Sequence, residues 1–195
     1  MSNNSSTGGY LVPASSPAPL EDDAFDDFLH DIGVGITGMD PTLVRPRWQP
    51  ESINLPDFGT NWMALGVTET DPDTYGVEVF DPVTLVTHLQ RHEVTTILCS
   101  FYGPNANGLC SQFRDGLQIS QNREALWLAG MALVETGKPM QAPELIKDRW
   151  TRRVDMPWVV RRGIFRDYPV LSLLSASGTL YTDVPNRSIP INAHQ

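Results

Sequence analysis

The sequence predicts an α+β fold in which a mainly antiparallel sheet is packed against helices. Three segments carry apolar residues at helical spacing, and several others alternate apolar with polar residues as strands do. Clusters of Gly, Pro, Asp and Asn separate these segments, and the sequence contains no internal repeat. With 41% hydrophobic residues in 195, the chain is long enough for one domain with a sizeable core and tails.

The first predicted helix covers residues 20–39. Four large apolar residues recur in it at helical spacing: Phe25, Phe28, Leu29 and Ile32. The opposite face is acidic and holds Asp22, Asp23, Asp26 and Asp27. Acidic side chains near the first turn of a helix interact favourably with the helix dipole, so they support a helix start at this place.

Four extended segments are expected next. The segment 42–48 is bracketed by Pro41 and Pro46 and is therefore expected at a sheet edge. Two strands, 62–71 and 74–80, flank a short turn, and the segment 87–103 is mostly strand.

Two helices are expected after the long strand, over Asn105–Leu117 and Gln121–Met131, with Asn105 and Ser120 as their N-caps. In the first of them, Leu109, Phe113 and Leu117 recur every four residues.

The C-terminal third is expected to return to strands. Residues 139–146 are expected to form a loop, and a strand should cover 148–170. One side of that strand would hold Trp150, Arg152, Val154, Met156 and Trp158. A last strand is expected over 178–184, followed by a polar tail.

The stretch "FYGPNANGLCSQFRDGLQI" places a glycine turn between a strand and a helix, where many proteins bind phosphate. A phosphate loop needs convergent N–H groups and usually a lysine, whereas this turn has no lysine and Pro104 removes a donor. The turn is therefore interpreted as structural. Gly103 permits the turn, Pro104 ends the strand and Asn105 caps the helix.

Other residues that could carry chemistry are few. His88 and His92 are four apart, which is compatible with a metal site, but no HExxH motif surrounds them. Ser100 follows Cys99 without a nucleophile-elbow motif. Cys99 and Cys110 are expected to be buried free thiols. We therefore expect no catalytic residue, metal or cofactor, and keep as an alternative a hydrolase with an unrecognised site near Ser100, His88 and His92.

The charge distribution points to protein partners. The net charge of −9 and a pI of about 4.7 argue against a protein whose main task is to bind phosphates. Six of the 14 basic residues nevertheless lie between Arg149 and Arg166. They are either the solvated face of a sheet or a partner surface, the latter formed by Arg149, Arg152, Arg153, Arg161 and Arg162. Opposite charges at Asp22, Asp23, Asp26 and Asp27 on the same chain would suit a head-to-tail ring.

Residues 1–19 are polar and rich in Ser, Pro and Gly, so a flexible N-terminal arm is expected, with one apolar anchor at Tyr10–Val12. The folded domain is expected over 20–185 and a C-terminal tail over 186–195. No signal peptide is evident, and the longest apolar run, Ala125–Val134, is too short to cross a bilayer. A soluble, cytoplasmic protein is expected.

Three separated blocks together resemble the phage neck terminator family, the tail-terminator proteins of tailed bacteriophages. They are "LVRPRWQPESINLPDFGTNWMALGV", "SFYGPNANGLCSQFRDGLQISQNREAL" and "APELIKDRWTRRVDM…RDYPVLSLLSASGTLYTD". The resemblance covers roughly residues 20–185. It is specific because the separated blocks agree with the family both in their order and in unusual residues. The first 19 residues lie outside it.

The resemblance implies a structural protein of the virion neck, assembled in the host cytoplasm. Such proteins form a ring, usually a hexamer, that caps the head-proximal end of the tail tube, ends its growth and joins the tail to the head connector. The implied partners are other copies of the chain, the tail tube protein, the connector or adaptor protein and, in a contractile tail, the sheath protein. Genomic DNA would pass through an acidic lumen without specific contacts, and no membrane is involved. A neck adaptor on the portal side is the alternative.

Overall fold

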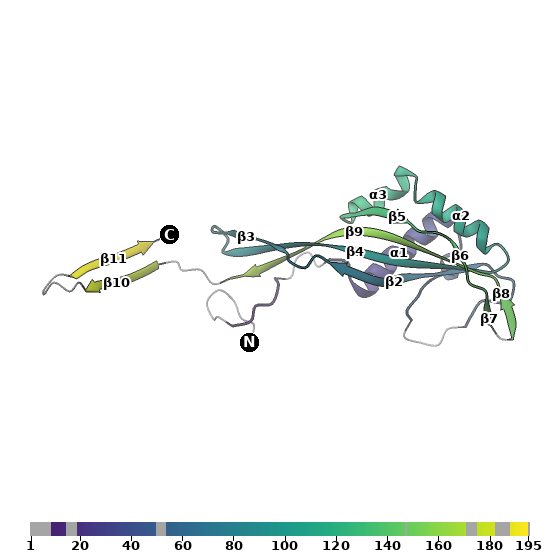
Figure 1. Cartoon of the computed structure of the whole chain (residues 1–195), viewed down its shortest axis with the longest axis horizontal. Helices are drawn as coiled ribbons and strands as arrows, with labels where there is room; N and C mark the ends of the chain where they lie inside the picture. The colour runs from purple at the N-terminus through teal and green to yellow at the C-terminus, as the bar shows by residue number, and fades with distance from the viewer. Residues whose placement is uncertain are drawn as a thin grey trace. The chain divides into compact units, whose positions relative to one another are not determined.

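The computed structural model describes residues 9–14, 19–49, 54–146, 148–170, 175–181 and 188–194. In these ranges, three α-helices, a short 3-10 helix over Pro41–Leu43 and a mostly antiparallel sheet confirm the predicted α+β class (Figure 1). The chain forms two compact units. The larger comprises 17–76 and 90–165, and the smaller comprises 1–16, 77–89 and 166–195.

The main sheet has seven strands, and five of them follow the order β1-β2-β4-β9-β5. Their bounds are Val44–Pro46 for β1, Trp62–Pro72 for β2, Val86–Tyr102 for β4, Arg153–Pro169 for β9 and Met131–Thr136 for β5. The two other strands are β3 (Val77–Asp81), which pairs with β4, and β6 (Met140–Gln141), which pairs with β9. The edge strand β1 pairs with β2 in parallel, whereas β2–β4 and β5–β9 are antiparallel. The segment 42–48 thus lies at an edge, as its prolines predict.

The helices are α1 (Asp22–Thr37), α2 (Ala106–Gly116) and α3 (Ser120–Leu128). Figure 1 shows α2 and α3 lying over β5 and β9. All three helices pack on the same face of the sheet, because their buried residues join one core with alternate residues of the strands. That face carries Met63, Leu65, Ile97, Cys99, Phe101, Val154, Met156, Trp158 and Val160.

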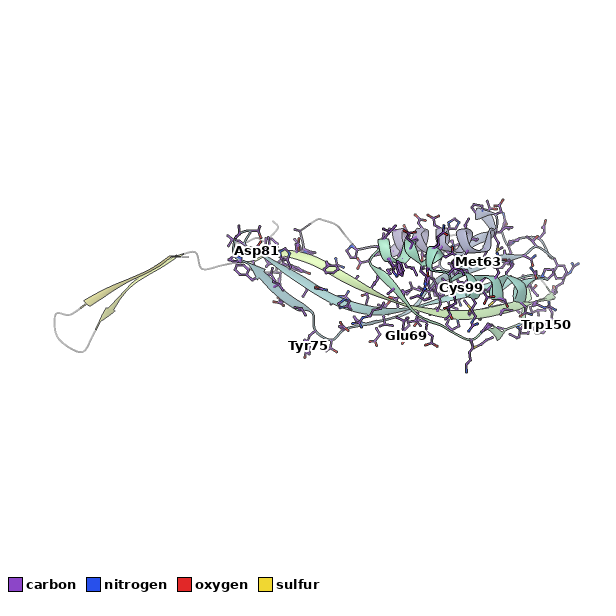
Figure 2. All side chains as sticks on the ribbon, turned by 90° about the horizontal axis from the view of Figure 1, so that it is seen from above. Met63, Glu69, Tyr75, Asp81, Cys99 and Trp150 are labelled. Atoms are coloured by element: carbon purple, nitrogen blue, oxygen red, sulfur yellow. The ribbon has the colours of Figure 1, made fainter. Side chains whose placement is uncertain are left out.

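Aromatic rings join the helices to this face. Phe113 of α2 packs against Phe101 at 5.8 Å between ring centroids and against Trp158 at 6.1 Å. Met63 and Cys99 lie in the helix-covered part of the sheet, whereas Trp150 lies toward one end of the larger unit (Figure 2). The opposite face of the sheet carries Trp62, Ala64, Ser100 and Tyr102, which alternate with the core residues.

The three helices begin and end within three residues of their expected limits, but the expected caps differ. Ser120 is the first helical residue of α3, and Ile119 takes the N-cap position. Asn105 is the N-cap residue of α2, yet its side chain makes no capping hydrogen bond.

The segment after α3 differs from the expectation. Gly130 has a φ of +70° and ends the helix, and Met131 begins β5, which pairs with β9. The apolar run Ala125–Val134 therefore divides into a helix and a strand, which its composition alone does not distinguish.

The expected loop over 139–146 contains β6 and β7 (Glu144–Ile146). β7 pairs with β8 (Arg149–Thr151), so the long strand expected over 148–170 is interrupted and resumes as β9. Val154, Met156 and Trp158 share the buried face as predicted, but Trp150 lies on β8 and is 71% exposed. The hairpin between β7 and β8 is the reason for this difference.

The smaller unit contains β10 (Ser175–Tyr181) and β11 (Ser188–His194), which pair in an antiparallel hairpin. β11 falls in the segment expected to be a polar tail, and β10 overlaps the expected last strand. In the same unit, the N–H of Ala14 donates to the carbonyl of Asp167 at 2.7 Å, and Leu11 lines a hollow with Leu89 and Tyr168. Most of the first 19 residues lie outside the described part of the chain. No helix in the described ranges is long and apolar enough to span a membrane.

Candidate interaction surfaces

The glycine turn between β4 and α2 is held by backbone and side-chain contacts within the chain. Gly103 has a φ of +102°, and a Cβ atom there would lie 2.6 Å from the carbonyl oxygen of Thr60. The N–H of Gly103 donates to the carbonyl of Arg152 at 3.1 Å, and the N–H of Asn105 donates to Oδ1 of Asn61 at 2.8 Å. Because these donors are already bonded within the chain, they do not converge on an open anion site.

The residues considered for metal or nucleophile chemistry are also engaged within the chain. Nδ1 of His88 lies 2.7 Å from Asp167, and Nδ1 of His92 lies 3.8 Å from Asp73. Within the described residues, no group of three or more His, Cys, Asp or Glu is placed to hold a metal ion. Ser100 is fully buried, and its hydroxyl accepts a hydrogen bond from Arg47 at 3.1 Å.

Both cysteines are free and buried, as predicted. Burial raises the pKa of the Cys99 thiol far above its usual range, and it raises the pKa of Cys110 to about 11. A thiol with a raised pKa is a poor nucleophile at neutral pH, so these residues are packing elements of the core.

Two of the five arginines expected at a partner surface have carboxylate partners within the chain. Arg162 is 8% exposed, and its Nε donates to Oε1 of Glu93 at 2.6 Å. Arg162 also donates to the carbonyl of Leu20 and lies over the ring of Phe25 at 4.5 Å. Because Phe25 belongs to α1 and Glu93 to β4, this arginine fixes the start of α1 on the sheet.

Arg153 forms a second internal ion-pair group. Its guanidinium donates to both carboxylate oxygens of Asp155, at 2.8 and 2.9 Å, and to Glu144 at 3.0 Å. The hydrogen bonds to Asp155 are the main cause that raises the pKa of Arg153 above its usual value. This side chain is therefore committed to its own chain.

The other three arginines of the expected set, Arg149, Arg152 and Arg161, are exposed. Arg149 lies over the ring of Phe58 at 5.0 Å, and Arg152 donates to the carbonyl of Pro104 at 3.0 Å. Arg161 and Arg162 point to opposite faces of β9, as the alternation of a strand predicts.

An arginine–aromatic surface lies on the sheet face opposite the helices, and sequence reasoning missed most of it. We define it by six residues that line a hollow of about 280 Å³: Arg45, Arg47, Trp48, Trp62, Tyr102 and Arg153. Trp62 and Tyr102 stack with ring centroids 3.9 Å apart, and Arg153 lies over Tyr102 at 5.6 Å. A second hollow, of about 320 Å³, adjoins it through Leu55 and Trp62 and contains Asp57 and Arg149.

The acidic surface of α1 consists of Asp22, Asp23, Asp26 and Asp27. Three of these aspartates border a hollow of about 690 Å³ on the helix-covered side of the sheet, together with Phe25, Trp48 and Arg162. Burial, followed by the charges of the other three aspartates, raises the pKa of Asp26. These carboxylates therefore repel one another in the isolated chain.

The comparison with protein families finds a match over most of the chain. The model of the family described as phage neck terminator protein matches residues 22–183. No curated protein matches the chain. The family match begins at the first residue of α1 and includes the arginine–aromatic surface, the glycine turn and β10. The chain therefore belongs to the phage neck terminator protein family, and it is a structural component of the virion neck.

Proposed function

We propose that the chain forms a ring, most simply of six copies, that caps the head-proximal end of the tail tube. The ring ends tube polymerisation and joins the finished tail to the head connector. The observation that carries this proposal beyond the family is the separation of charge across the sheet. The acidic surface of α1 lies on the helix-covered side, and the arginine–aromatic surface lies on the opposite side.

Surfaces of opposite charge on one chain suit a head-to-tail contact, in which the acidic surface of one copy meets the arginine–aromatic surface of the next. Trp48 lines both hollows, so the two surfaces meet at the sheet edge. A head-to-tail contact closes into a ring when its rotation allows. The same contact explains how one chain supplies both halves of an interface.

Passage of DNA through the ring is consistent with the charge of the chain. A net charge of −9 per copy gives a lumen that repels the phosphate backbone, so DNA slides without being held. In this proposal the remaining partners are proteins: the tail tube, the connector or adaptor and, in a contractile tail, the sheath. Assembly takes place in the host cytoplasm.

We also propose that the role is structural rather than enzymatic, and that residues 20–185 act as one terminator domain. Ser100 is buried against Arg47, and both histidines lie beside aspartates, so none of the three is presented as a nucleophile or base in a shared pocket. Replacement of Ser100, His88 or His92 by Ala should leave tail assembly intact.

The proposal is tested by electron microscopy of lysates from a phage that carries a nonsense codon early in this gene. Without the ring, tail tubes should exceed the normal length, and filled heads should remain unjoined. Supplying the wild-type chain from a plasmid should restore tails of uniform length. Tails of normal length with unjoined heads would instead support a neck adaptor on the portal side. Normal virions in the absence of the chain would contradict the proposal.

A further inference from the structure

The arginine–aromatic surface combines aromatic rings with two arginines, Arg45 and Arg47, that have no carboxylate partner among the described residues. Arg45 donates to the carbonyl oxygens of Thr42 and Asn54, at 3.2 and 2.9 Å, and Arg47 donates to the hydroxyl of Ser100. Within the described residues, neither of these guanidinium groups is paired with a carboxylate. Trp48 lies beside Arg47, 5.9 Å from ring centroid to guanidinium carbon, and it is 66% exposed.

This combination is typical of the centre of a protein interface. Trp, Tyr and Arg are the residue types that most often dominate binding energy, because they bury a large area and still make directional hydrogen bonds. The stacked rings of Trp62 and Tyr102 line the hollow but are only 9% and 8% exposed. The groups that a partner can cover are therefore the exposed ring of Trp48 and the half-buried guanidinium groups of Arg45 and Arg47. Two cations that have no carboxylate partner in the described part of the chain fit an acidic partner segment, since the guanidinium group binds carboxylates in a bidentate manner.

The acidic surface of α1 has the complementary properties. Asp22, Asp23 and Asp27 are exposed, and they form no ion pair with any residue in the described ranges. Asp23 and Asp27 are four residues apart on one helix, so both can face the same partner. Burial, followed by the charges of the neighbouring aspartates, raises the pKa of Asp26, and a cationic partner would offset the repulsion among these aspartates.

We propose that the arginine–aromatic surface of one copy binds the acidic surface of α1 of the next copy, with Arg45 and Arg47 meeting Asp23 and Asp27. This inference rests on the proposed ring and names the two surfaces that join its subunits. The chain itself supplies the complementary acid in every ring, which favours this occupant over another acidic protein. The net charge of −9 disfavours DNA as the occupant.

The inference is tested by charge reversal and exchange in complementation of the nonsense phage, with infectious particles as the measure. The basic reversal is Arg45→Glu with Arg47→Glu, and the acidic reversal is Asp23→Arg with Asp27→Arg. Each should lower the yield about tenfold or more, because like charges would then oppose each other across every junction. The chain that carries all four substitutions should recover most of the wild-type yield.

Two further variants test whether the loss of yield comes from these two arginines and not from a change in net charge. The control Arg114→Glu with Lys138→Glu changes the net charge by the same amount as the basic reversal, and it should give wild-type yield. The milder pair Arg45→Gln with Arg47→Gln keeps a side chain at position 47 that can hydrogen-bond Ser100, and it should also lower the yield. Circular dichroism of each purified chain establishes that it is folded.

The outcomes separate this inference from the proposed function. Wild-type yield from both reversals would overturn the inference and leave the ring proposal standing. Loss with the basic reversal alone, without recovery in the four-fold variant, would also overturn it. Duplex DNA that shifts in a gel with the wild type and not with the basic reversal would then identify DNA as the occupant. Normal virions from the nonsense phage alone would contradict the ring proposal itself.

Discussion

The buried pair of Arg162 and Glu93 provides the sharpest test of how the larger unit is held together. Arg162 joins β9 to β4 through Glu93 and to the start of α1 through Leu20 and Phe25. Arg162→Ala removes these contacts at once. The Glu93 carboxylate, 4% exposed, then keeps Arg91, at 2.6 Å, as its ion-pair partner among the described residues.

The expected loss of stability follows from this geometry. Removing one partner of a buried ion pair destabilises a protein by about 3–5 kcal/mol, because the other charge stays buried. Since Arg91 still neutralises part of the charge on Glu93, we expect the low end of this range, about 3 kcal/mol. With a urea dependence of about 2–3 kcal/mol per M for a chain of this size, the unfolding midpoint should fall by about 1–1.5 M.

The assay is urea unfolding of the full chain, followed by circular dichroism. Arg161→Ala is the matched control, because Arg161 is adjacent to Arg162 in sequence but its guanidinium group is exposed. Removing the side chain of Arg161 should change the free energy of unfolding by less than about 0.5 kcal/mol. The double variant Arg162→Leu with Glu93→Leu should recover much of the loss, since it removes both buried charges. Equal midpoints for Arg162→Ala and Arg161→Ala would refute the reasoning.

Three further predictions concern single sites. Gly103→Ala should destabilise the chain by about 2 kcal/mol or more, measured by urea unfolding, because it combines a positive φ with a clash against the Thr60 carbonyl; a wild-type midpoint would contradict this. Cys99 and Cys110 should not react with Ellman's reagent at pH 8 until the chain is unfolded, and rapid labelling of the native chain would show that they are accessible. Asp26→Asn should stabilise the chain slightly at neutral pH, by about 0.2–0.5 kcal/mol for each like-charge pair removed. Because the pKa of Asp26 is raised in the folded state, the ionised carboxylate destabilises the wild-type chain above pH 3.8, and this destabilisation grows as pH rises through the folded pKa. The stability gained by Asp26→Asn should therefore vanish at pH 3. A gain that is independent of pH would contradict the electrostatic cause.

Sequence pattern was sufficient where one element is amphipathic over several turns. The α1 helix was predicted from the spacing of Phe25, Leu29 and Ile32, all of which are buried. The sharing of one side of a strand by Val154, Met156 and Trp158 was likewise predicted from their alternation, and the structure shows that this side is buried. In such segments the local period directly encodes the face that is removed from water.

Pattern was insufficient where the outcome depends on a distant partner. Arg161 and Arg162 are adjacent and chemically alike, yet one is exposed and the other is buried against Glu93, which is 69 residues away in sequence. The strand β5 was missed because an apolar run without a clear period suits a helix and a strand equally. Arg45 and Arg47 lie in a proline-bracketed segment with no local motif, and only the pairing of β1 with β2 brings them to the rings of Trp62 and Tyr102.

The most direct test of the central proposal is a cryo-electron microscopy reconstruction of the assembled neck in intact virions. The account predicts a closed ring of this chain, most simply of six copies, at the head-proximal end of the tail tube, with DNA in its lumen. It further predicts that the arginine–aromatic surface of each copy faces α1 of its neighbour. A single copy, a two-fold dimer or a position away from the end of the tube would contradict the account.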